Sequence, residues 1–352
     1  FKKSDYLGII QELAPEIGTS AAGMLEAARL PHLRHVIRIG GEETPGTYPF
    51  EGILERGRAA WQQAVEALAP KLKSDDPINI QFTSGTTGQP KAAVLRHRHL
   101  VSYVLGSVEF MQASEDDAAL VSVPPYHVAG IAAILSNVYA GRRVVQLPTF
   151  DAADWVALVR AESVTSAMVV PTMLTLIVEV LDAEGADGPG LQTLRSLSYG
   201  GGRMPSPTIQ RALELLPTTA FVNAYGLTET SSTVALLGPD EHREAMASAD
   251  PVVRARLGSA GRPLPTIQVT IRDDIGDEVA VGQPGEIWVR GEQVSGEYRG
   301  SAPRLTADGW FPTHDGGRMD ADGFLHVTGR IDDVIVKGGQ NVSPGEIEGV
   351  LL

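Results

Sequence analysis

Apolar residues recur with two different periods along the chain, and the change of period divides the predicted fold. Between residues 78 and 258, short apolar runs alternate with stretches of helical period, which predicts helices between strands near 118–123, 143–148, 164–170, 194–199 and 220–224. This alternation is typical of a parallel sheet covered by helices. Beyond Gly258, Ile267, Val269 and Ile271 alternate with polar residues, which predicts an antiparallel, barrel-like subdomain.

The first part of the chain carries helical patterns but no recognisable chemistry. Apolar residues at helical spacing predict helices over residues 4–16, 21–30 and 50–72. After them, Ile78, Ile80 and Phe82 alternate with Asn79 and Gln81, which predicts a half-buried strand. The helical stretches are interpreted as scaffold.

Composition and charge narrow the classes of partner. The 352 residues are 43% hydrophobic and 20% charged, as in soluble globular proteins, and they suffice for one large domain or two ordinary ones. A formal net charge of −14 argues against a nucleic acid or an anionic membrane as a general partner. The sequence has no cysteine, which excludes disulfides and thiolate metal sites, and it shows no membrane-spanning apolar run or signal peptide. We therefore expect a cytoplasmic protein.

The strongest chemical signal is the loop at residues 83–91, Thr-Ser-Gly-Thr-Thr-Gly-Gln-Pro-Lys. Gly85 and Gly88 allow backbone amides to turn toward an anion, and Lys91 adds a positive charge. Hydroxyl donors come from Thr83, Ser84, Thr86 and Thr87. The loop predicts a phosphate-binding site, but not a Walker A loop, because Gln89 and Pro90 separate the glycine from the lysine. A glycine-rich hairpin turn with a solvated lysine is the alternative.

Two further segments come directly after predicted strands, where ligands bind in sheets of this type. The first is Gly200-Gly201-Gly202, which either lets a flat group approach the backbone or is a flexible loop. The second is Tyr225-Gly226-Leu227-Thr228-Glu229-Thr230. In it, Tyr225 offers an aromatic face, Thr228 a hydroxyl and Glu229 a hard oxygen ligand for Mg²⁺. Taken alone, this segment could be a capped turn.

These motifs, in this order, resemble those of the adenylate-forming superfamily, which contains acyl-CoA synthetases, adenylation domains of peptide synthetases and luciferases. The resemblance extends over nearly the whole chain. It implies that the loop at 83–91 holds the phosphates of ATP, that Glu229 binds Mg²⁺, and that Asp315 and Arg330 hold the ribose. Further nucleotide contacts are implied for Gly200, Gly201, Gly202, Asn223, Tyr225, Gly226 and Thr228. The sequence departs from the family at Ala92 and His314, where glycine is usual.

The resemblance also implies where the acid substrate lies. Tyr126-His127 resembles the family's aromatic–histidine element, so His127 is expected to orient the carboxylate or gate the acyl pocket. Without the resemblance, a histidine after an aromatic residue would be interpreted as a packing residue. The expected walls of the pocket are Val128, Ala129, Ile131, Tyr199 and Gly200. The residues expected to act in catalysis are His127, Thr228, Glu229 and Lys91.

The predicted architecture is an α/β adenylate-forming fold in three parts. Residues 1–256 are expected to form two βα subdomains and 257–331 a β-barrel subdomain. Residues 332–352 are expected to contain a hinge at Asp332 and the beginning of a mobile C-terminal α+β domain. Judged against the family, an N-terminal segment and most of the C-terminal domain, with its catalytic lysine, lie outside this sequence.

The predicted reaction is attack of a substrate carboxylate on the α-phosphate of Mg·ATP, which gives acyl-AMP and pyrophosphate, followed by thioester formation with coenzyme A. Loading of a carrier protein's phosphopantetheine and an acyl-AMP ligase are alternatives. A peptide-synthetase-type domain is disfavoured because no clearly placed aspartate comes after His127 to hold an amino group. A nucleotide-binding scaffold without turnover is disfavoured by Lys91, Glu229, Asp315 and Arg330. The identity of the acid and a homodimer stay open.

Overall fold

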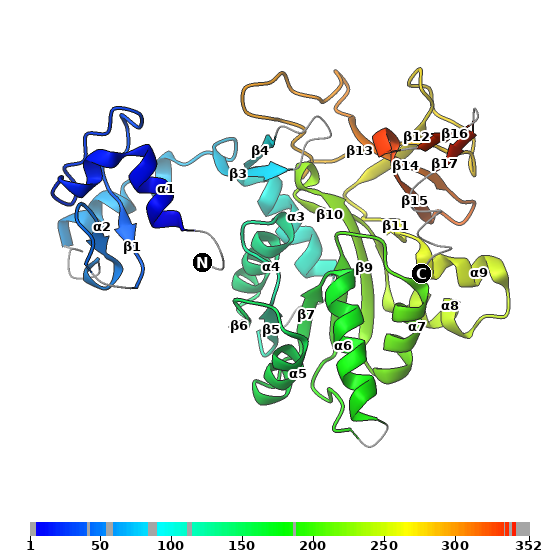
Figure 1. Ribbon diagram of the computed structural model, residues 1–352. Coiled ribbons are helices and arrows are strands. Elements are labelled where there is room, and N and C mark those ends of the chain that lie inside the picture. Colours follow the sequence, from blue (N-terminus) through cyan, green and yellow to red (C-terminus); the bar gives the residue numbers. More distant parts are fainter. Residues whose placement is uncertain are drawn as a thin grey trace. The chain divides into compact units, whose positions relative to one another are not determined.

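The computed structural model describes residues 5–40, 43–53, 59–83, 90–110, 115–185, 188–333, 335–337 and 340–342. The chain forms two compact units, Phe1–Lys73 and Ser74–Leu352 (Figure 1). None of the helices in these ranges has the length and apolar character needed to cross a membrane.

The first unit contains short elements around a small core. Helices α1 and α2 span Tyr6–Leu13 and Ala59–Glu66, and strands β1 (Ile37–Arg38) and β2 (Tyr48–Pro49) pair in parallel. The helix predicted over 21–30 is wrong, because this segment forms turns and extended chain that place Leu25 and Ala27 in the core. Of the helix predicted over 50–72, residues 54–58 lie outside the described residues. The described part contains α2 and the short 3₁₀ turns Phe50–Gly52 and Ala69–Lys71.

The second unit is organised by a seven-stranded sheet with the order β11-β10-β9-β8-β7-β5-β6. Strands β5 to β9 are parallel, while β10 and β11 run antiparallel at one edge. The predicted parallel α/β arrangement is confirmed. The strands are β5 Ala118–Val121, β6 Arg143–Gln146, β7 Ser166–Val169, β8 Ser196–Gly200, β9 Ala220–Leu227, β10 Ser232–Leu237 and β11 Arg262–Pro263.

Helices cover both faces of this sheet. On one face lie α5 (Ala152–Ala161), α6 (Pro171–Glu184) and α7 (Ser206–Leu215), which bury Trp155 and Ile177 against Leu197 and Phe221 in the main core. On the other face lie α3 (His97–Phe110) and α4 (Val128–Tyr139), and between them and the sheet there is a cavity. The layers are thus packed tightly on one side of the sheet and leave space on the other.

A two-stranded ribbon carries the predicted phosphate loop. Strand β3 (Pro77–Thr83) pairs antiparallel with β4 (Lys91–Arg96), and the loop connects them. The predicted alternation along β3 is present, but the buried face is the opposite one: Phe82 is 74% exposed, whereas Gln81 is 6% exposed. In the described part of the chain, packing covers the side of the ribbon that carries Gln81 and leaves the apolar side open.

A separate four-stranded antiparallel sheet comes next, with the order β12-β13-β14-β15. Its inner face packs Ile271, Ile287, Val289 and Phe311. The antiparallel prediction is confirmed. Within the described residues β12 and β15 do not pair, so a closed barrel stays a prediction. The strands are β12 Gln268–Arg272, β13 Gly285–Arg290, β14 Phe311–Met319 and β15 Leu325–Arg330, and a small ribbon of β16 (Ile335–Lys337) and β17 (Gln340–Val342) comes after them.

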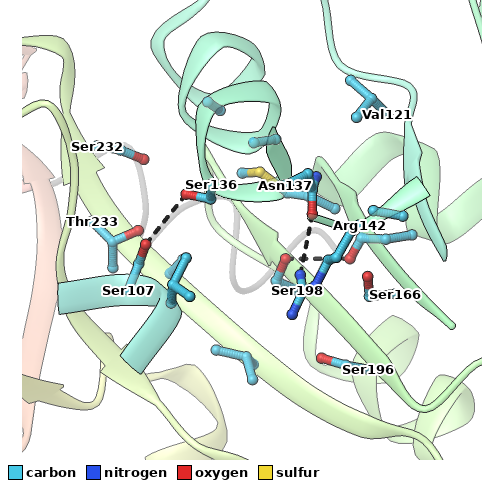
Figure 2. A pocket seen from close by; sticks show the side chains of 18 of the residues that line it. Ser107, Val121, Ser136, Asn137, Arg142, Ser166, Ser196, Ser198, Ser232 and Thr233 are labelled. Carbon is cyan, nitrogen blue, oxygen red and sulfur yellow. Dashed lines mark hydrogen bonds between the residues drawn. The ribbon is translucent and has the colours of Figure 1, made fainter. Parts of the chain in front are cut away.

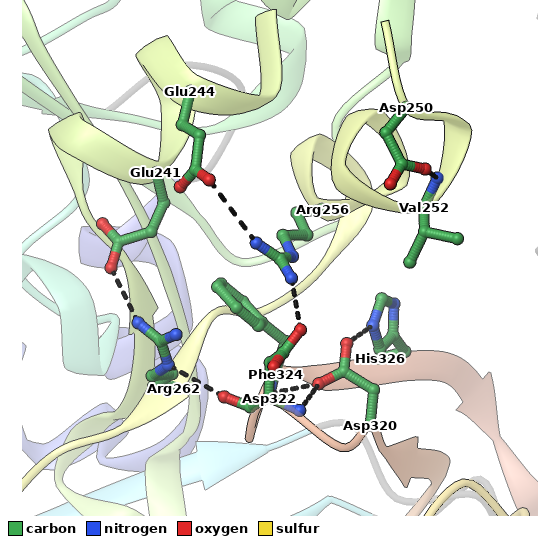
Figure 3. Close-up of polar contacts among 10 residues, drawn as sticks. All are labelled: Glu241, Glu244, Asp250, Val252, Arg256, Arg262, Asp320, Asp322, Phe324 and His326. Atoms are coloured by element: carbon green, nitrogen blue, oxygen red, sulfur yellow. Dashed lines mark hydrogen bonds and ion pairs between the residues drawn. The ribbon is translucent and has the colours of Figure 1, made fainter. Parts of the chain in front are cut away.

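Charged side chains join the β14–β15 turn to α8 (Pro239–Ala247) and the chain after it, as Figure 3 shows. The Phe324 ring lies between two guanidinium groups, 4.5 Å from Arg256 and 4.2 Å from Arg262. These arginines also pair with carboxylates of α8, Arg262 with Glu241 at 3.2 Å and Arg256 with Glu244 at 3.9 Å. These contacts, called the arginine–phenylalanine junction below, hold the four-stranded sheet against the seven-stranded sheet. They thereby bring β14 close to β9.

Candidate active site

The carboxyl ends of β5, β8 and β9 meet at one edge of the large sheet, as they must in a parallel arrangement. His127 lies after β5 as the N-cap of α4, where its Nδ1 accepts a hydrogen bond from the Ala129 N–H at 3.2 Å. Gly200 ends β8, and Tyr225 lies near the end of β9. Three of the predicted segments are therefore brought to the same edge.

Glycine is required at two of these positions because neighbouring backbone lies too close for a side chain. A Cβ at Gly200 would be 2.2 Å from the Ala224 carbonyl oxygen, and one at Gly226 would be 1.8 Å from the Ser232 carbonyl oxygen. Gly201 has a φ of +80°, a backbone conformation that glycine adopts readily and residues with a Cβ rarely adopt. The close approach of β9 is thus sufficient to explain why residue 200 is glycine, and no bound ligand is needed for that explanation.

Tyr225, Asp315 and Arg330 form a cluster that joins the two sheets around the buried Asp315 carboxylate. The Tyr225 hydroxyl on β9 donates to Asp315 Oδ2 on β14 at 2.6 Å. Arg330 is the cross-strand partner of Asp315 on β15, and its Nε lies 3.2 Å from Asp315 Oδ1. Burial raises the pKa of Asp315, an effect that Arg330 and the Tyr225 hydrogen bond oppose. Burial and the charge of Asp315 raise the pKa of Tyr225 well above its usual range, so its hydroxyl stays protonated and donates.

His314, one of the two departures from the family, keeps the backbone conformation that glycine would supply. Its φ of 59° lies in the left-handed region, which costs a non-glycine residue about 1–2 kcal/mol. Two contacts hold it there: its N–H donates to Glu286 Oε1 at 2.9 Å, and Arg304 Nη1 donates to its Nε2 at 2.9 Å. The irregular backbone of β14 next to Asp315 is therefore retained without glycine.

Glu229 lies in the 3₁₀ turn Thr228–Thr230 and is 8% exposed. The turn is tight, because the next two residues, Ser231 and Ser232, both have positive φ. Tyr298 donates its hydroxyl to Glu229 Oε1 at 2.6 Å. Among the described residues, Tyr298 is the hydrogen-bond donor to this carboxylate, and Thr228 beside it is half-buried. The carboxylate is thus oriented through one oxygen.

Tyr298 belongs to a segment, residues 293–299, that the sequence did not single out. The segment runs beside β4: Val94 N–H donates to the Glu297 carbonyl at 2.9 Å, and Arg299 N–H donates to the Ala92 carbonyl at 2.9 Å. Its other contacts reach the turn of Glu229, where the Ser295 N–H donates to the Glu229 carbonyl at 2.8 Å. The segment connects the strand after the phosphate loop to the turn that carries Glu229. Because 69 residues separate Tyr298 from Glu229, local spacing gave no sign of this contact.

Most of the phosphate loop, Ser84, Gly85, Thr86, Thr87 and Gly88, lies outside the described residues. Its two ends are described, and they are paired: Thr83 faces Lys91 across the ribbon, and the Thr83 hydroxyl donates to the Lys91 carbonyl at 3.5 Å. Asp332, the predicted hinge residue, is exposed in the 3₁₀ turn Ile331–Asp333 after β15.

The cavity beside α4 has a volume of about 390 Å³ and is lined by a mixture of apolar and hydroxyl side chains (Figure 2). Ala129 of α4 lines it, as predicted, whereas Val128 packs into a separate cluster with Leu95 and Leu100. Hydroxyl groups come from the sheet and from both inner helices, among them Ser107, Ser136, Ser166, Ser196, Ser198 and Thr233.

The prediction for Tyr199 is corrected, because its side chain lies on the opposite face of the sheet. Successive residues of a strand point to opposite faces, so Ser196 and Ser198 line the cavity while Leu197 and Tyr199 enter the main core. The Tyr199 hydroxyl donates to His242 Nε2 at 2.8 Å, and His242 Nδ1 donates to the Gly238 carbonyl at 2.7 Å. Asn223 also faces away from the cavity, and its amide donates to the Ser259 carbonyl at 2.8 Å.

The strand order and the covering helices define an α/β fold, and comparison with known proteins gives the family. Residues 18–299 match the AMP-binding enzyme family. The chain belongs to this family.

Several relatives and a solved structure are similar over most of the chain. A 2-succinylbenzoate–CoA ligase of Bacillus cereus (strain ATCC 10987 / NRS 248) is 35% identical over 81% of the chain and 56% of its own length. A fatty acid–[acyl-carrier-protein] ligase of Streptomyces coeruleorubidus is 34% identical over 88% of the chain and 60% of its own length. The structure of the O-succinylbenzoate coenzyme A synthetase of Bacillus subtilis in complex with ATP and magnesium ion superposes with a TM-score of 0.70 at 31% identity, over 80% of this chain and 56% of that one. The chain thus spans little more than half the length of these relatives.

We expect the buried His242 to make the fold less stable in acid. Burial lowers the pKa of His242 to about 4, whereas an unfolded histidine titrates near 6.5. Below about pH 6.5 the unfolded state therefore binds a proton that the folded state does not, and stability falls as the pH drops toward 4, by about 1.4 kcal/mol per unit of pKa difference.

Urea denaturation of the parent and of His242→Gln at pH 7 and pH 4.5 measures this effect. The variant should lose less stability than the parent between the two pH values, and His32→Gln, at an exposed position, should behave like the parent. Equal losses in the parent and in His242→Gln would contradict the assignment.

Proposed function

We propose that the protein containing this chain activates a carboxylic acid with Mg·ATP and then transfers the acyl group to a thiol. A carboxylate oxygen attacks the α-phosphorus, the bond to the β-phosphate breaks, and pyrophosphate leaves. The thiol sulfur then attacks the acyl carbon of the acyl-AMP, and AMP leaves as the thiol loses its proton. The observation that carries this proposal is the placement of Asp315, Arg330 and Glu229 around the carboxyl edge of the sheet.

The nucleotide would lie over the Tyr225, Asp315 and Arg330 cluster. A buried carboxylate can accept both hydroxyls of a ribose, and the partly exposed Arg330 guanidinium can donate to the same sugar. The phosphates would extend from there toward Thr228 and the loop that begins at Thr83 and ends at Lys91. The Tyr225 hydroxyl is already engaged by Asp315, so its role toward adenine would be limited to its ring.

Glu229 fits a magnesium ligand, because it is a buried carboxylate with one oxygen held by Tyr298 and the other available. In the described residues there is no group of three or more side chains suited to hold a metal ion, so the protein would supply few ligands and the phosphates and water the others. When bound, Mg²⁺ would neutralise charge on the phosphates. A relative of this chain was solved with ATP and magnesium ion, which supports this assignment.

The acid would enter the cavity along α4, with its carboxylate near His127. His127 is the N-cap of α4, where the partial positive charge of the helix N-terminus favours an anion. Ala129 lines the cavity beside it, whereas Ile131 of the same helix, also a predicted wall, is not among the residues that line the cavity. We therefore assign to His127 the orientation of the substrate carboxylate.

Coenzyme A is the acceptor that we propose, in line with the named coenzyme A ligases among the relatives. The similarity to a fatty acid–[acyl-carrier-protein] ligase makes a carrier protein the second candidate. Assay of the full-length protein with each acceptor would distinguish them. A homodimer and a mobile domain beyond Asp332 are predictions that the described residues leave as they stand.

Replacement of Glu229 by glutamine should lower the rate of acyl-AMP formation. Loss of a charged contact to the metal of about 3 kcal/mol corresponds to roughly 10²-fold in rate. ATP–pyrophosphate exchange by the full-length protein, measured over a range of Mg²⁺ concentrations, gives the effect.

Two residues near Glu229 are replaced in the same assay, one as a variant with a smaller expected effect and one as a control. Tyr298→Phe should raise the Mg²⁺ concentration needed for half-maximal exchange, because Glu229 loses its orienting hydrogen bond. Glu297→Gln should leave it unchanged, since that side chain pairs with Arg96 instead. Parent-like exchange by Glu229→Gln at limiting Mg²⁺ would rule out Glu229 as a metal ligand.

Replacement of Asp315 by alanine should weaken binding of AMP, since both ribose hydroxyls lose a shared acceptor. Hydrogen bonds to a charged group contribute about 1.5–3 kcal/mol each, which corresponds to at least about tenfold in affinity. Calorimetric titration of the chain with AMP checks this, with Asp322→Ala in the exposed turn before β15 as the matched control. Equal AMP affinity in parent and Asp315→Ala would mean that the ribose binds elsewhere.

A further inference from the structure

We propose that the acid carries a second carboxylate at the end remote from the reacting one, and that Arg142 binds it. The proposal rests on the proposed function, because it concerns the acid that occupies the cavity beside α4. It names a substrate class, dicarboxylic acids, and a residue that selects it.

The cavity is long enough to hold both ends of such a molecule. It begins near Ala129 and Ala224, next to His127 and Tyr225, at the carboxyl edge of the sheet. It continues to Asp117 and Arg195 at the amino ends of β5 and β8. Along β5, the lining residues Asp117 and Val123 are six residues apart, or about 20 Å of extended chain. A substrate with its carboxylate at His127 would therefore place its other end at the amino edge.

The walls are not those of a pocket for an alkyl chain. Ser166, Ser196 and Ser198 place three hydroxyl groups on the inner face of two neighbouring strands, and Ser107 and Ser136 hydrogen bond at 3.3 Å across the inner helices. A hydroxyl buried against a hydrocarbon without a hydrogen bond costs about 1–3 kcal/mol. Ser107, Ser136 and Ser198 already hydrogen bond within the protein. Of these five hydroxyls, an unsubstituted fatty acid would therefore leave those of Ser166 and Ser196 without a partner among the described residues, which disfavours it relative to an acid with polar substituents.

The far end of the cavity carries positive charge. The charged residues that line the cavity are Arg142, Arg195 and Asp117, two cations and one anion. The Arg142 side chain is 13% exposed, and its Nη1 donates to Asn137 Oδ1 at 3.1 Å (Figure 2). Its Nε is 3.5 Å from Asp117 Oδ2, which is an ion pair but not a hydrogen bond, and Asp117 also pairs with Arg195. One carboxylate is thus shared by two guanidinium groups.

A carboxylate of the substrate would add a second anion beside these two guanidinium groups. Burial lowers the pKa of Arg142, which means that the surroundings stabilise its charge less than water does, and a ligand carboxylate would offset that loss. A guanidinium is also the side chain best shaped to bind a carboxylate through two hydrogen bonds. The structural alternative is that Arg142 merely ties the chain after α4 to Asp117, and in that case it would not distinguish between ligands.

The test uses two stable acyl-adenylate mimics, acyl-sulfamoyl adenosines, that have the same chain length and differ only in ending with a methyl or a carboxylate group. Calorimetric titration of the 352-residue chain with each mimic, over a series of chain lengths, gives the affinities. At the best length, the carboxylate-terminated mimic should bind at least about tenfold more tightly than its methyl-terminated counterpart.

Variants assign the preference to a residue. Arg142→Met should abolish the preference while leaving the affinity for the methyl-terminated mimic unchanged, and Arg142→Lys should retain part of it. Arg143→Met is the matched control: Arg143 is the next residue, is largely exposed, pairs with Glu162 and does not line the cavity, so the preference should persist. Melting curves of each variant confirm that it is folded, and the comparison of the two mimics in the parent stands even if Arg142→Met does not fold.

The outcomes separate this proposal from the proposed function. Equal binding of the two mimics by the parent, or tighter binding of the methyl-terminated one, overturns the substrate class but leaves acid activation in place. A preference that survives Arg142→Met in the folded variant overturns the role of Arg142. Failure of both mimics to bind when AMP itself binds overturns the placement of the acid in this cavity, and with it the proposal.

Discussion

The buried carboxylate of Asp315 is the interaction on which the candidate active site depends. It is 8% exposed and joins β14 of the antiparallel sheet to β9 of the large sheet through the Tyr225 hydroxyl. A carboxylate at this depth is tolerated only when donors and a counter-charge accompany it, and here Tyr225 and Arg330 supply them. The carboxylate and its two partners come from three strands in two sheets, so the carboxylate is held in place only when both sheets are correctly docked. The arginine–phenylalanine junction around Phe324 makes that docking stable.

A second connection is the segment 293–299, which contacts both the β3–β4 ribbon and the turn that carries Glu229. It extends the β3–β4 ribbon through backbone hydrogen bonds, and it orients Glu229 through Tyr298. The Arg96–Glu297 ion pair, with both oxygens of the carboxylate within 2.9 Å, reinforces its contact with β4. Strand β4, which follows the predicted phosphate loop, and the proposed metal ligand are therefore fixed by one piece of chain, so that their spacing would be set before a nucleotide binds.

The sequence predicted those features that depend on local pattern. The parallel strands and the antiparallel pairing beyond Gly258 could be predicted from residue periodicity, and the site motifs from their position after strands. Features that depend on distant packing were not predictable in this way. Tyr199 and Gln81 each lie on the face opposite to the one that a local interpretation chose, because alternation gives two faces but not which of them is covered. Tyr298 and Arg142 acquire their partners only through tertiary contacts. At His314 the sequence departs from glycine, yet two side-chain contacts keep the glycine-like conformation.

The central claim is that Asp315, Arg330 and Glu229, brought together at the junction of the two sheets, hold the nucleotide. A crystal structure of this chain with AMP and Mg²⁺ tests it most directly. The account predicts both ribose hydroxyls within hydrogen-bonding distance of the Asp315 carboxylate and the α-phosphate next to Thr228. A nucleotide bound elsewhere, with Asp315 contacting only Tyr225 and Arg330, would contradict it.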